Sequence, residues 1–408
     1  MTLDDHKYLP YGRQFLDEDD IRAVTEVLQG DWLTTGPTIK KFEDELQQFV
    51  KSDYVVSCSS GTAALHMAYM ALGIGPGDRV IVPAISFVAT ANGAVYCGAD
   101  ILFTDVDPAT GLMRAQDVLT LIASMTSAEL QSVAAITPVN LAGEVAEIEA
   151  ISKIARQHGW QVIIDSCHAL GSIYTDEEGK TRTAGDCHFS DMEVFSFHPV
   201  KTIAMGEGGA VTTNDPAYYD RLCLLRNHGL QKDADQWFTA PEAGKPPPWY
   251  YEMQILGYNY RQSDIHCALG LSQLAKLPAF IDHRRRLARK YDHLLTGISA
   301  HIKPMNSTPG CRAARHLYVV LIDFAALGMT RADFVAALSA CQIGSQLHYI
   351  PIYAHPFYVE KYGPQSRPGA EEYYARTLSL PLHMAVTEED VDYIVQQISE
   401  IITGSSAR

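Results

Sequence analysis

The stretch WQVIIDS, residues 160–166, is a short apolar run that ends in a carboxylate, and similar runs recur along the first half of the chain. Their near-continuous hydrophobicity is typical of strands that are buried on both faces of a sheet. Amphipathic stretches, such as residues 61–73 and 147–159, lie between them. This alternation predicts an α/β fold with a parallel sheet. The other runs are YVVSCSS at 54–60, RVIVPAIS at 79–86, ADILFTDVD at 99–107 and SVAAITPV at 132–139.

The pattern changes after about residue 262. Residues 263–295 form a long helical stretch, which we expect to be interrupted near Pro278 and to connect two domains. We therefore predict an N-terminal arm and a large α/β domain over residues 1–262, and the connector with a smaller α+β domain over residues 263–408. The elements expected after the connector are a strand at 316–324, a helix at 330–342, an extended segment at 345–353 and a helix at 387–402.

The segment from Gln231 to Glu252 is rich in proline and aromatic residues and contains GKPPPWYY. It is too long for an ordinary turn, and loops of that length in a compact domain usually carry function. We expect it to cover a site.

Composition excludes several classes of function. Of the 408 residues, 47% are hydrophobic and 20% charged, as in a globular protein with a large core. The formal net charge of -16 argues against general affinity for nucleic acid, because binding a phosphate backbone needs clustered lysine and arginine. The opening MTLDDHKYLPYGRQF lacks the basic and apolar regions of a signal peptide, and no stretch approaches the roughly 18 apolar residues of a membrane span. We therefore expect a cytoplasmic protein with no membrane partner.

Cysteine usage points away from metal and disulfide chemistry. The spacing fits neither a zinc site nor a disulfide scaffold, so we expect reduced, mostly buried thiols and no metal. The eight cysteines stand singly, at 58, 97, 167, 187, 223, 267, 311 and 341.

The first segment that points to chemistry is SSGTAALH, residues 59–66, where a strand leads through small residues into a helix. Bare backbone N–H groups at such a helix start can hold a phosphate, helped by the helix dipole. Tight packing alone explains many such turns, so that alternative stays open. Neither a GxGxxG fingerprint nor a GxxxxGK[ST] loop is present, which disfavours dinucleotide and nucleoside-triphosphate binding.

A second segment, IIDSCHALG, places Asp165 at the end of an apolar strand, with His168 shortly after it. Burying a carboxylate is costly unless it meets a cation or several donors, so the position implies a partner. A protonated pyridine nitrogen would serve. A carboxylate that caps the following turn is an equally good interpretation.

A third segment, MEVFSFHPVKTIAMGEGGAVTTND at 192–215, contains Lys201 between an apolar run and a glycine-rich turn. Most lysines are solvated, but this one is flanked by small and apolar residues, and the glycines let backbone pass close to a ligand. A lysine in such surroundings is a candidate for a lowered pKa and Schiff-base chemistry.

Five segments, in this order and spacing, resemble the pyridoxal-phosphate-dependent sugar aminotransferases often called the DegT family. They are SSGTAALH, IIDSCHALG, FSFHPVKTIAMGEGGAVTTND, LLRNHG and GYNYRQSDIHCALGLSQL. The similarity covers nearly the whole chain, from LTTGPTIKKFEDEL at 33–46 to the last helix. The resemblance implies the fold-type I architecture of aspartate aminotransferase, usually a dimer, with pyridoxal 5'-phosphate as the cofactor.

The resemblance also implies roles for single residues. Lys201 would hold the cofactor as a Schiff base and serve as acid and base for proton transfer. Asp165 would keep the pyridine nitrogen protonated, which makes the ring an electron sink. His168 would lie near the phenolic oxygen, and Phe87 would stack on the ring face.

The implied phosphate site is shared between two subunits. One subunit would supply Gly61, Thr62 and Ser196, and the other would supply Asn259. A dimer with a two-fold axis would then hold two equivalent composite sites. The alternative that Asn259 merely caps the helix after it stays open.

The implied reaction moves an amino group from an amino acid, which the family suggests is L-glutamate, to the keto group of a nucleotide-linked sugar. The nearest likeness within the family is to the 4-aminotransferases of pseudaminic acid biosynthesis, which act on a UDP-linked 4-keto-6-deoxy-N-acetylhexosamine. That likeness rests on ITPVNLAGE, HLYVVLI, LHYIPIY and EEYYARTLSLPLH. The chain departs at Asn140, where the family commonly has histidine.

Several rival functions stay open at this point. They are an aminotransferase for a GDP- or dTDP-linked sugar, a non-catalytic regulatory protein that binds pyridoxal phosphate, a sugar dehydratase and a cysteine desulfurase. The dehydratase pattern replaces the Schiff-base lysine by histidine, so Lys201 favours amino transfer. A desulfurase needs a reactive cysteine on a mobile loop, and no cysteine lies in an obvious exposed Gly/Ser loop.

Overall fold

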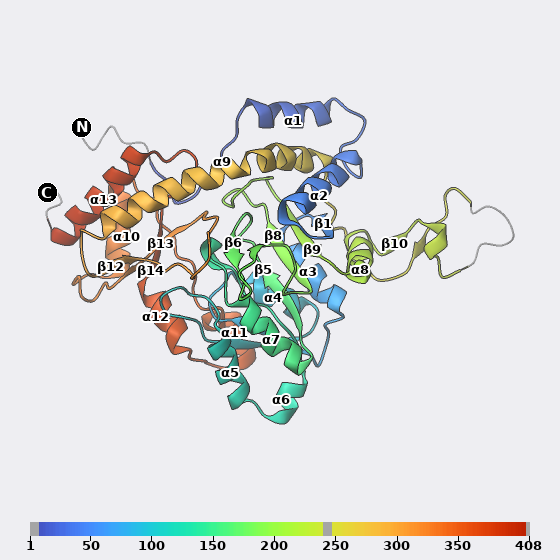
Figure 1. The fold of residues 1–408 in the computed structure, drawn as a ribbon, viewed down its shortest axis with the longest axis horizontal. Coiled ribbons are helices and arrows are strands. Elements are labelled where there is room, and N and C mark those ends of the chain that lie inside the picture. Colours follow the sequence, from blue (N-terminus) through green and yellow to red (C-terminus); the bar gives the residue numbers. More distant parts are fainter. Residues whose placement is uncertain (1–7, 240–246, 405–408) are drawn as a thin grey trace.

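The computed structural model describes residues 8–239 and 247–404, and a seven-stranded sheet forms its centre (Figure 1). β1, β2 and β5 each have four buried residues of five, as expected for strands covered on both faces. In their order across the sheet, the strands are β1 (Tyr54–Cys58), β9 (Gly209–Thr213), β8 (Met192–Ser196), β5 (Gln161–Asp165), β4 (Val133–Ile136), β2 (Arg79–Pro83) and β3 (Asp100–Thr104).

The sheet is mostly parallel, with one exception. β9 runs antiparallel to both of its neighbours, β1 and β8, whereas all other neighbouring pairs are parallel. The link between β8 and β9 contains no helix, whereas the crossover that joins two parallel neighbours usually contains one. This link, residues 197–208, contains Lys201.

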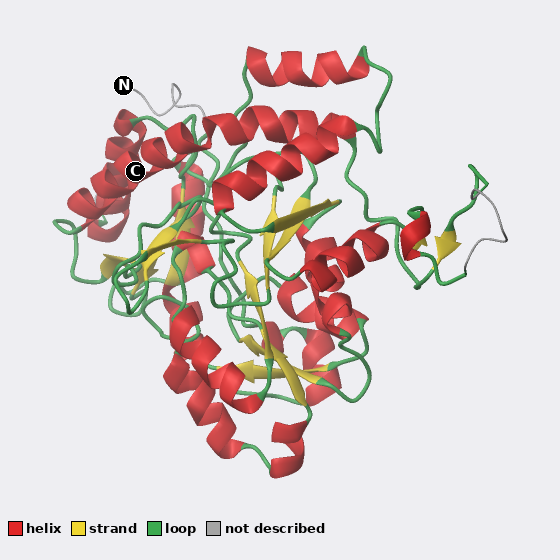
Figure 2. Cartoon of the chain, turned by 45° about the vertical axis from the view of Figure 1, so that its right-hand side comes forward, coloured by secondary structure: helices red, strands yellow, loops and turns green. Residues whose placement is uncertain are grey.

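Helices pack on both sides of the sheet (Figure 2). α3 covers the middle, where it contacts β8, β9 and β5. The helices expected at 61–73 and 147–159 are confirmed as α3 and α7. The helices of this part are α1 (Glu18–Leu28), α2 (Pro37–Val50), α3 (Gly61–Leu72), α4 (Ala89–Tyr96), α5 (Ala115–Ser124), α6 (Ser127–Gln131), α7 (Ile148–His158) and α8 (Pro216–Arg226).

α9 (Asp264–Leu295) is one continuous helix of 32 residues that runs along the top of the view in Figure 1. The expected interruption near Pro278 is wrong. Pro278 itself is exposed, and the buried residues around it, Leu274, Leu277 and Phe280, hold the helix together across the lost hydrogen bond.

A three-stranded sheet and two helices form the C-terminal part, together with the second half of α9. The first half of α9 packs in a different core, beside α2. A domain boundary between residues 262 and 263 therefore stays a proposal. The elements are β12 (Ile302–Pro304), β13 (Tyr318–Ile322), β14 (Thr377–Leu380), α10 (Arg331–Ala340) and α13 (Glu388–Thr403).

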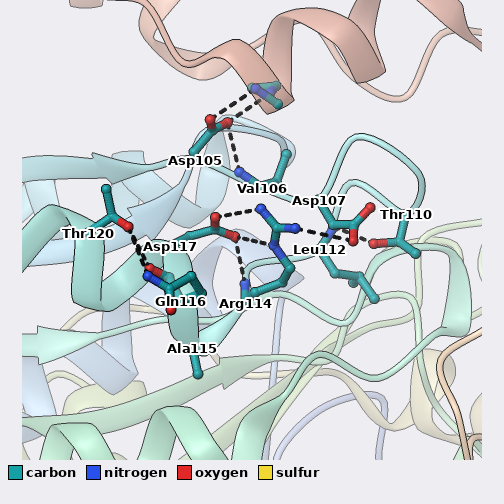
Figure 3. A network of polar contacts seen from close by, with 12 residues as sticks. Asp105, Val106, Asp107, Thr110, Leu112, Arg114, Ala115, Gln116, Asp117 and Thr120 are labelled. Carbon is teal, nitrogen blue, oxygen red and sulfur yellow. Dashed lines mark hydrogen bonds and ion pairs between the residues drawn. The ribbon is translucent and has the colours of Figure 1, made fainter.

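Two further helices, α11 (Pro356–Tyr362) and α12 (Pro368–Arg376), return to the large sheet. Asp105, just after β3, accepts hydrogen bonds from the backbone N–H groups of Gly369 and Ala370 at the start of α12, at 2.9 and 2.8 Å (Figure 3). Arg114 beside it pairs with Asp117. A separate backbone hydrogen bond holds the chain before α11 beside the end of β2: the N–H of Ile352 donates to the carbonyl of Ala84 at 2.8 Å.

Two short hairpins complete the fold. One pairs β6 (Ile173–Thr175) with β7 (Thr181–Thr183), and the other pairs β10 (Leu230–Gln231) with β11 (Glu252–Met253). The second hairpin projects away from the body of the molecule (Figure 1), and residues 240–246 of its tip lie outside the described residues.

All eight cysteines are free thiols, as expected, but only Cys58, Cys187 and Cys267 are buried and the other five are half-buried. Within residues 8–239 and 247–404, no helix is long and apolar enough to cross a membrane.

Candidate active site

A pocket of about 670 Å³ opens at the carboxyl ends of the parallel strands. Ligands bind at this edge in open α/β sheets. Seven of the eight residues predicted from the sequence line it, namely Gly61, Thr62, Phe87, Asp165, His168, Ser196 and Lys201. The eighth, Asn259, is exposed and does not.

The N-terminus of α3 forms one wall of the pocket. The side chain of Ser60 caps the helix by accepting from the N–H of Ala63 at 3.1 Å. The N–H groups of Gly61 and Thr62 belong to the first turn, where a helix has no acceptor of its own to offer them. This end of α3 can therefore take an anion.

Gly61 keeps that wall open. A Cβ at this position would come within 2.8 Å of the Cβ of Ser196 and 3.3 Å of the sulfur of Cys167. Only glycine leaves room for a ligand beside Ser196, whose hydroxyl accepts a long hydrogen bond from the N–H of His198 at 3.4 Å.

Asp165 ends β5 and is 5% exposed. One carboxylate oxygen accepts from the hydroxyl of Thr90 at 2.7 Å, and the other accepts from the N–H of Cys167 at 3.1 Å. The hydroxyl of Thr90 also contacts that of Ser86 at 2.7 Å. One side chain and one backbone N–H thus hold the carboxylate, and Ser86 in turn positions Thr90.

Lys201 lies in the link between β8 and β9, where its N–H donates to the carbonyl of His198 at 2.8 Å. Burial lowers the pKa of its amine, since the charged form loses water. The nearby Cys167 and Asp165 oppose that shift. A lowered pKa increases the share of the uncharged amine, which is the form that attacks a carbonyl.

Three histidines surround the inner part of the pocket. Burial lowers the pKa of His168 and His316 well below the usual range, and that of His348 to about 3. The rings of His168 and His316 meet edge to face at 4.4 Å. All three are neutral at physiological pH, and among the described residues that line the pocket Lys201 is the only lysine or arginine.

The described residues fit pyridoxal phosphate. Phe87 lines the pocket and is 55% exposed, so its aromatic ring is available to a ligand there. Asp165 supplies a carboxylate, Lys201 an amine, and the start of α3 an anion cradle, which are the groups that a pyridine, an aldehyde and a phosphate need. By contrast, the described residues contain no cluster of three possible metal ligands.

Asn259 lies five residues before α9, and the cap of that helix is Ser263, whose hydroxyl accepts from the N–H of His266. The alternative that Asn259 caps the helix is therefore wrong. Its backbone bridges to Asn227.

The segment 231–252 was expected to cover a site. Within the part of the chain that the structure describes, none of its residues lines this pocket. Residues 231–239 and 247–252 therefore do not cover the pocket of their own chain.

Sequence reasoning missed several residues of the site, namely Ser86, Thr90, His316, His348 and Tyr349. Thr90 belongs to the site only through its hydrogen bond to Asp165, and the other four line the pocket. His316 and Tyr349 stand in HLYVVLI and LHYIPIY, two segments that carried the family resemblance but no chemical signal of their own.

Comparisons with known proteins agree with this geometry. Residues 14–399 match the model of the DegT/DnrJ/EryC1/StrS aminotransferase family. The chain is 36% identical over 401 residues to the spore coat polysaccharide biosynthesis protein SpsC of Bacillus subtilis, which covers 98% of each chain.

Solved structures give the same result. PseC of Helicobacter pylori, an aminotransferase involved in the biosynthesis of pseudoaminic acid, is 29% identical, with a TM-score of 0.87 over 98% of this chain and 100% of its own. The pyridoxal-phosphate form of the putative sugar aminotransferase Spr1654 from Streptococcus pneumoniae is 26% identical, with a TM-score of 0.85 over the same shares.

Proposed function

Because the chain belongs to the DegT/DnrJ/EryC1/StrS aminotransferase family and is a pyridoxal-phosphate-dependent sugar aminotransferase, we propose a specific reaction for it. It moves an amino group from an amino acid, L-glutamate, to C4 of a nucleotide-linked 4-keto-6-deoxy sugar. The observation that carries the proposal is one continuous pocket with the amine of Lys201 and the carboxylate of Asp165 at its floor.

The cofactor supplies an electrophilic carbon and an electron sink. Lys201 would hold it and, once released, would take the proton from the carbon that carries the amino group and give one to the carbon on the other side of that nitrogen. Asp165 keeps the pyridine nitrogen protonated, and Phe87 lies on the ring face. Gly61, Thr62 and Ser196 hold the phosphate.

The outer pocket suits a sugar. Tyr11, Gln346 and His355 offer polar groups there without a fixed charge. Among the described lining residues, Lys201 is the only lysine or arginine, so this chain presents no permanent cation for the diphosphate of a nucleotide sugar. Part of the substrate site must therefore come from elsewhere, which supports a composite site in a homodimer.

We propose a UDP-linked N-acetylhexosamine as the sugar substrate, for a pseudaminic acid-type surface sugar. Support comes from the likeness to PseC and from LHYIPIY, whose first four residues line the pocket. The departure at Asn140 does not weaken it, since Asn140 is fully buried and lies outside the pocket. The alternative is a dTDP- or GDP-linked sugar.

A reloading assay tests the substrate. Glutamate first converts the protein to its amino form, and the visible absorption of the lysine-linked cofactor disappears. Nucleotide keto-sugars are then added one at a time, and the return of the absorption is timed. We expect the UDP-linked 4-keto-6-deoxy-N-acetylhexosamine to restore it fastest. The parent sugar without the keto group is the matched control and should restore none.

The result separates the alternatives. A faster return with the dTDP-linked sugar would replace UDP in the proposal. No return with any keto-sugar, but a return with keto acids, would contradict amino transfer to sugars.

We further propose that Asn259 reaches the phosphate site of the other subunit, because in its own chain it is exposed and away from the pocket. An amide can donate to a phosphate oxygen without adding a charge that competes with Lys201. Residues 231–239 and 247–252 project outward (Figure 1), and we propose that in the dimer they cover the pocket of the other subunit.

A subunit mixture tests this arrangement. Asn259→Asp keeps the size but sets a like charge against the phosphate, so we expect the pure variant and pure Lys201→Ala to be inactive. After subunit exchange, mixed dimers hold both lesions in one site and none in the other. An equal mixture should regain about a quarter of wild-type activity, because half of the dimers are mixed and each has one intact site of two.

Asn306→Asp, an exposed amide of the C-terminal part, is the control and should stay active alone. If the mixture stays inactive although mixed dimers form, Asn259 acts within its own chain and the shared site is wrong.

A further inference from the structure

The hydrogen bonds around His168 determine where its proton lies. The N–H of Ala142 donates to Nδ1 of His168 at 3.3 Å, so Nδ1 carries no proton. Burial lowers the pKa of the ring well below its usual range, which keeps the ring neutral. A neutral imidazole has one N–H, and here it must be at Nε2.

The N–H at Nε2 faces the hydroxyl of Tyr349, with 3.1 Å between the two atoms. Because His168 donates in this contact, the oxygen of Tyr349 accepts, and its own proton is free to point elsewhere. Burial raises the pKa of Tyr349 well above its usual range, so the hydroxyl keeps that proton. The side chain lines the pocket, and its ring centroid is 6.0 Å from that of Phe87.

The backbone around Ala142 is built for this contact. Ala142 has φ 55° and ψ 20°, a left-handed conformation that a residue with a Cβ rarely adopts. Asn140 stabilises the turn, since its amide oxygen accepts from the N–H of Ala146 and its amide nitrogen donates to the hydroxyl of Ser166, both at 3.0 Å. The residue at which the chain departs from its family thus supports the turn that orients His168.

We propose that Tyr349 is a further cofactor-contacting residue, whose hydroxyl donates to the phenolic oxygen of pyridoxal phosphate while His168 orients it. This differs from the role implied by the family, in which His168 itself lies beside that oxygen. The inference rests on the proposed role of Lys201 as the residue that holds the cofactor.

The other titratable groups near Tyr349 do not supply this donor. Nδ1 of His348 contacts the hydroxyl of Ser379 at 2.8 Å. Burial keeps His316 neutral and raises the pKa of Tyr11 and Cys167. Asp165 faces the opposite end of the cofactor ring, because it serves the pyridine nitrogen. Lys201 is linked to the cofactor.

Tyr349→Phe removes the hydroxyl and keeps the ring. A donor to the phenolic oxygen withdraws charge that otherwise holds the proton on the lysine-linked nitrogen, so its loss should raise the pKa of that nitrogen. We expect a rise of about one unit or more, the size of one hydrogen bond to a charged oxygen. The measurement is a titration of the visible absorption against pH, without sugar or amino donor.

Tyr353→Phe is the matched control. It removes a hydroxyl four residues away that donates to Glu371 at 3.4 Å and does not line the pocket, so the pKa should stay at the wild-type value. An unchanged pKa in Tyr349→Phe would overturn the proposal.

Two replacements of His168 provide a second measurement. Glutamine offers an oxygen to the N–H of Ala142 and an N–H to Tyr349, so His168→Gln should keep the wild-type pKa. Leucine offers neither, so His168→Leu should raise it as Tyr349→Phe does. If the double variant His168→Leu with Tyr349→Phe shifts the pKa further than Tyr349→Phe alone, His168 acts on the cofactor independently and the proposal is wrong.

The experiments distinguish a failure of the role proposed for Tyr349 from a failure of the role proposed for Lys201. If borohydride reduction of the wild type labels a lysine other than Lys201, the cofactor site itself is wrong and the role of Tyr349 with it. If Lys201 is labelled and the pKa of Tyr349→Phe is unchanged, Tyr349 alone is wrong. The sugar substrate does not enter either result.

Discussion

Replacing Lys201 by alanine is expected to remove the visible absorption of the lysine-linked cofactor and to abolish amino transfer. The variant loses both the covalent anchor and the proton-transfer group, and a positioned acid–base group alone contributes about 10²–10⁴-fold. The fold should survive, because Lys201 belongs to a link between strands and not to the sheet. Absorption spectra and single-turnover rates with glutamate measure both losses.

The lysine is identified independently by borohydride reduction of the wild type, followed by mapping of the modified peptide. Lys180→Ala is the matched control, since Lys180 is exposed and pairs only with Glu178 in the salt bridges that the structure describes. Label on any lysine other than 201, or amino transfer by Lys201→Ala near the wild-type rate, would contradict the assignment.

The large sheet could be predicted because its strands are buried on both faces. Runs such as 79–86 and 160–166 must then be apolar throughout, and this signal needs no knowledge of the neighbouring strands. The antiparallel direction of β9 could not be predicted from its residues, since a strand has the same composition whichever way it runs. The connection before it, residues 197–208, contains no helix, returns the chain antiparallel to β8 and also carries Lys201.

The chemistry of the site divides in the same way. Asp165 and Lys201 could be found because each is a charged residue in an uncharged segment. Asp165 is a carboxylate at the end of an apolar strand, and Lys201 is a lysine among small residues. Tyr349 and His316 are ordinary in their own segments. They reach the pocket because the segments around them, with Leu317 and Ile352, pack into the core of the large sheet, and a tertiary contact of this kind leaves no periodicity to detect.

Pro278 shows the limit of a local rule. A proline inside a helical stretch predicts a break, but tertiary packing can outweigh the lost hydrogen bond. Pro278 is exposed, so the buried side of α9 still packs against two cores, which holds the helix together. The sequence contains the proline but not the packing around it.

Replacing Asp165 by asparagine should keep the fold and the bound cofactor while amino transfer falls steeply. The amide has the size of the carboxylate, and the hydroxyl of Thr90 can turn to accept from it while donating to Ser86. What disappears is the negative charge that keeps the pyridine nitrogen protonated.

The size of the effect follows from the loss of a buried ion pair. Breaking such a pair costs about 3–5 kcal/mol. If that energy is lost from the transition state, the rate with glutamate falls by about two to four orders of magnitude. Single-turnover spectra follow the disappearance of the lysine-linked absorption directly.

Asp105→Asn is the matched control for this charge removal. Asp105 caps α12 and lies in the network of Figure 3, away from the pocket. Its replacement should lower the melting temperature and leave the single-turnover rate near the wild-type value. Asp165→Asn should do the reverse, because its partners can rearrange but its charge cannot be replaced. A near wild-type rate in Asp165→Asn would mean that the carboxylate only caps the turn at Cys167, whose N–H it also binds.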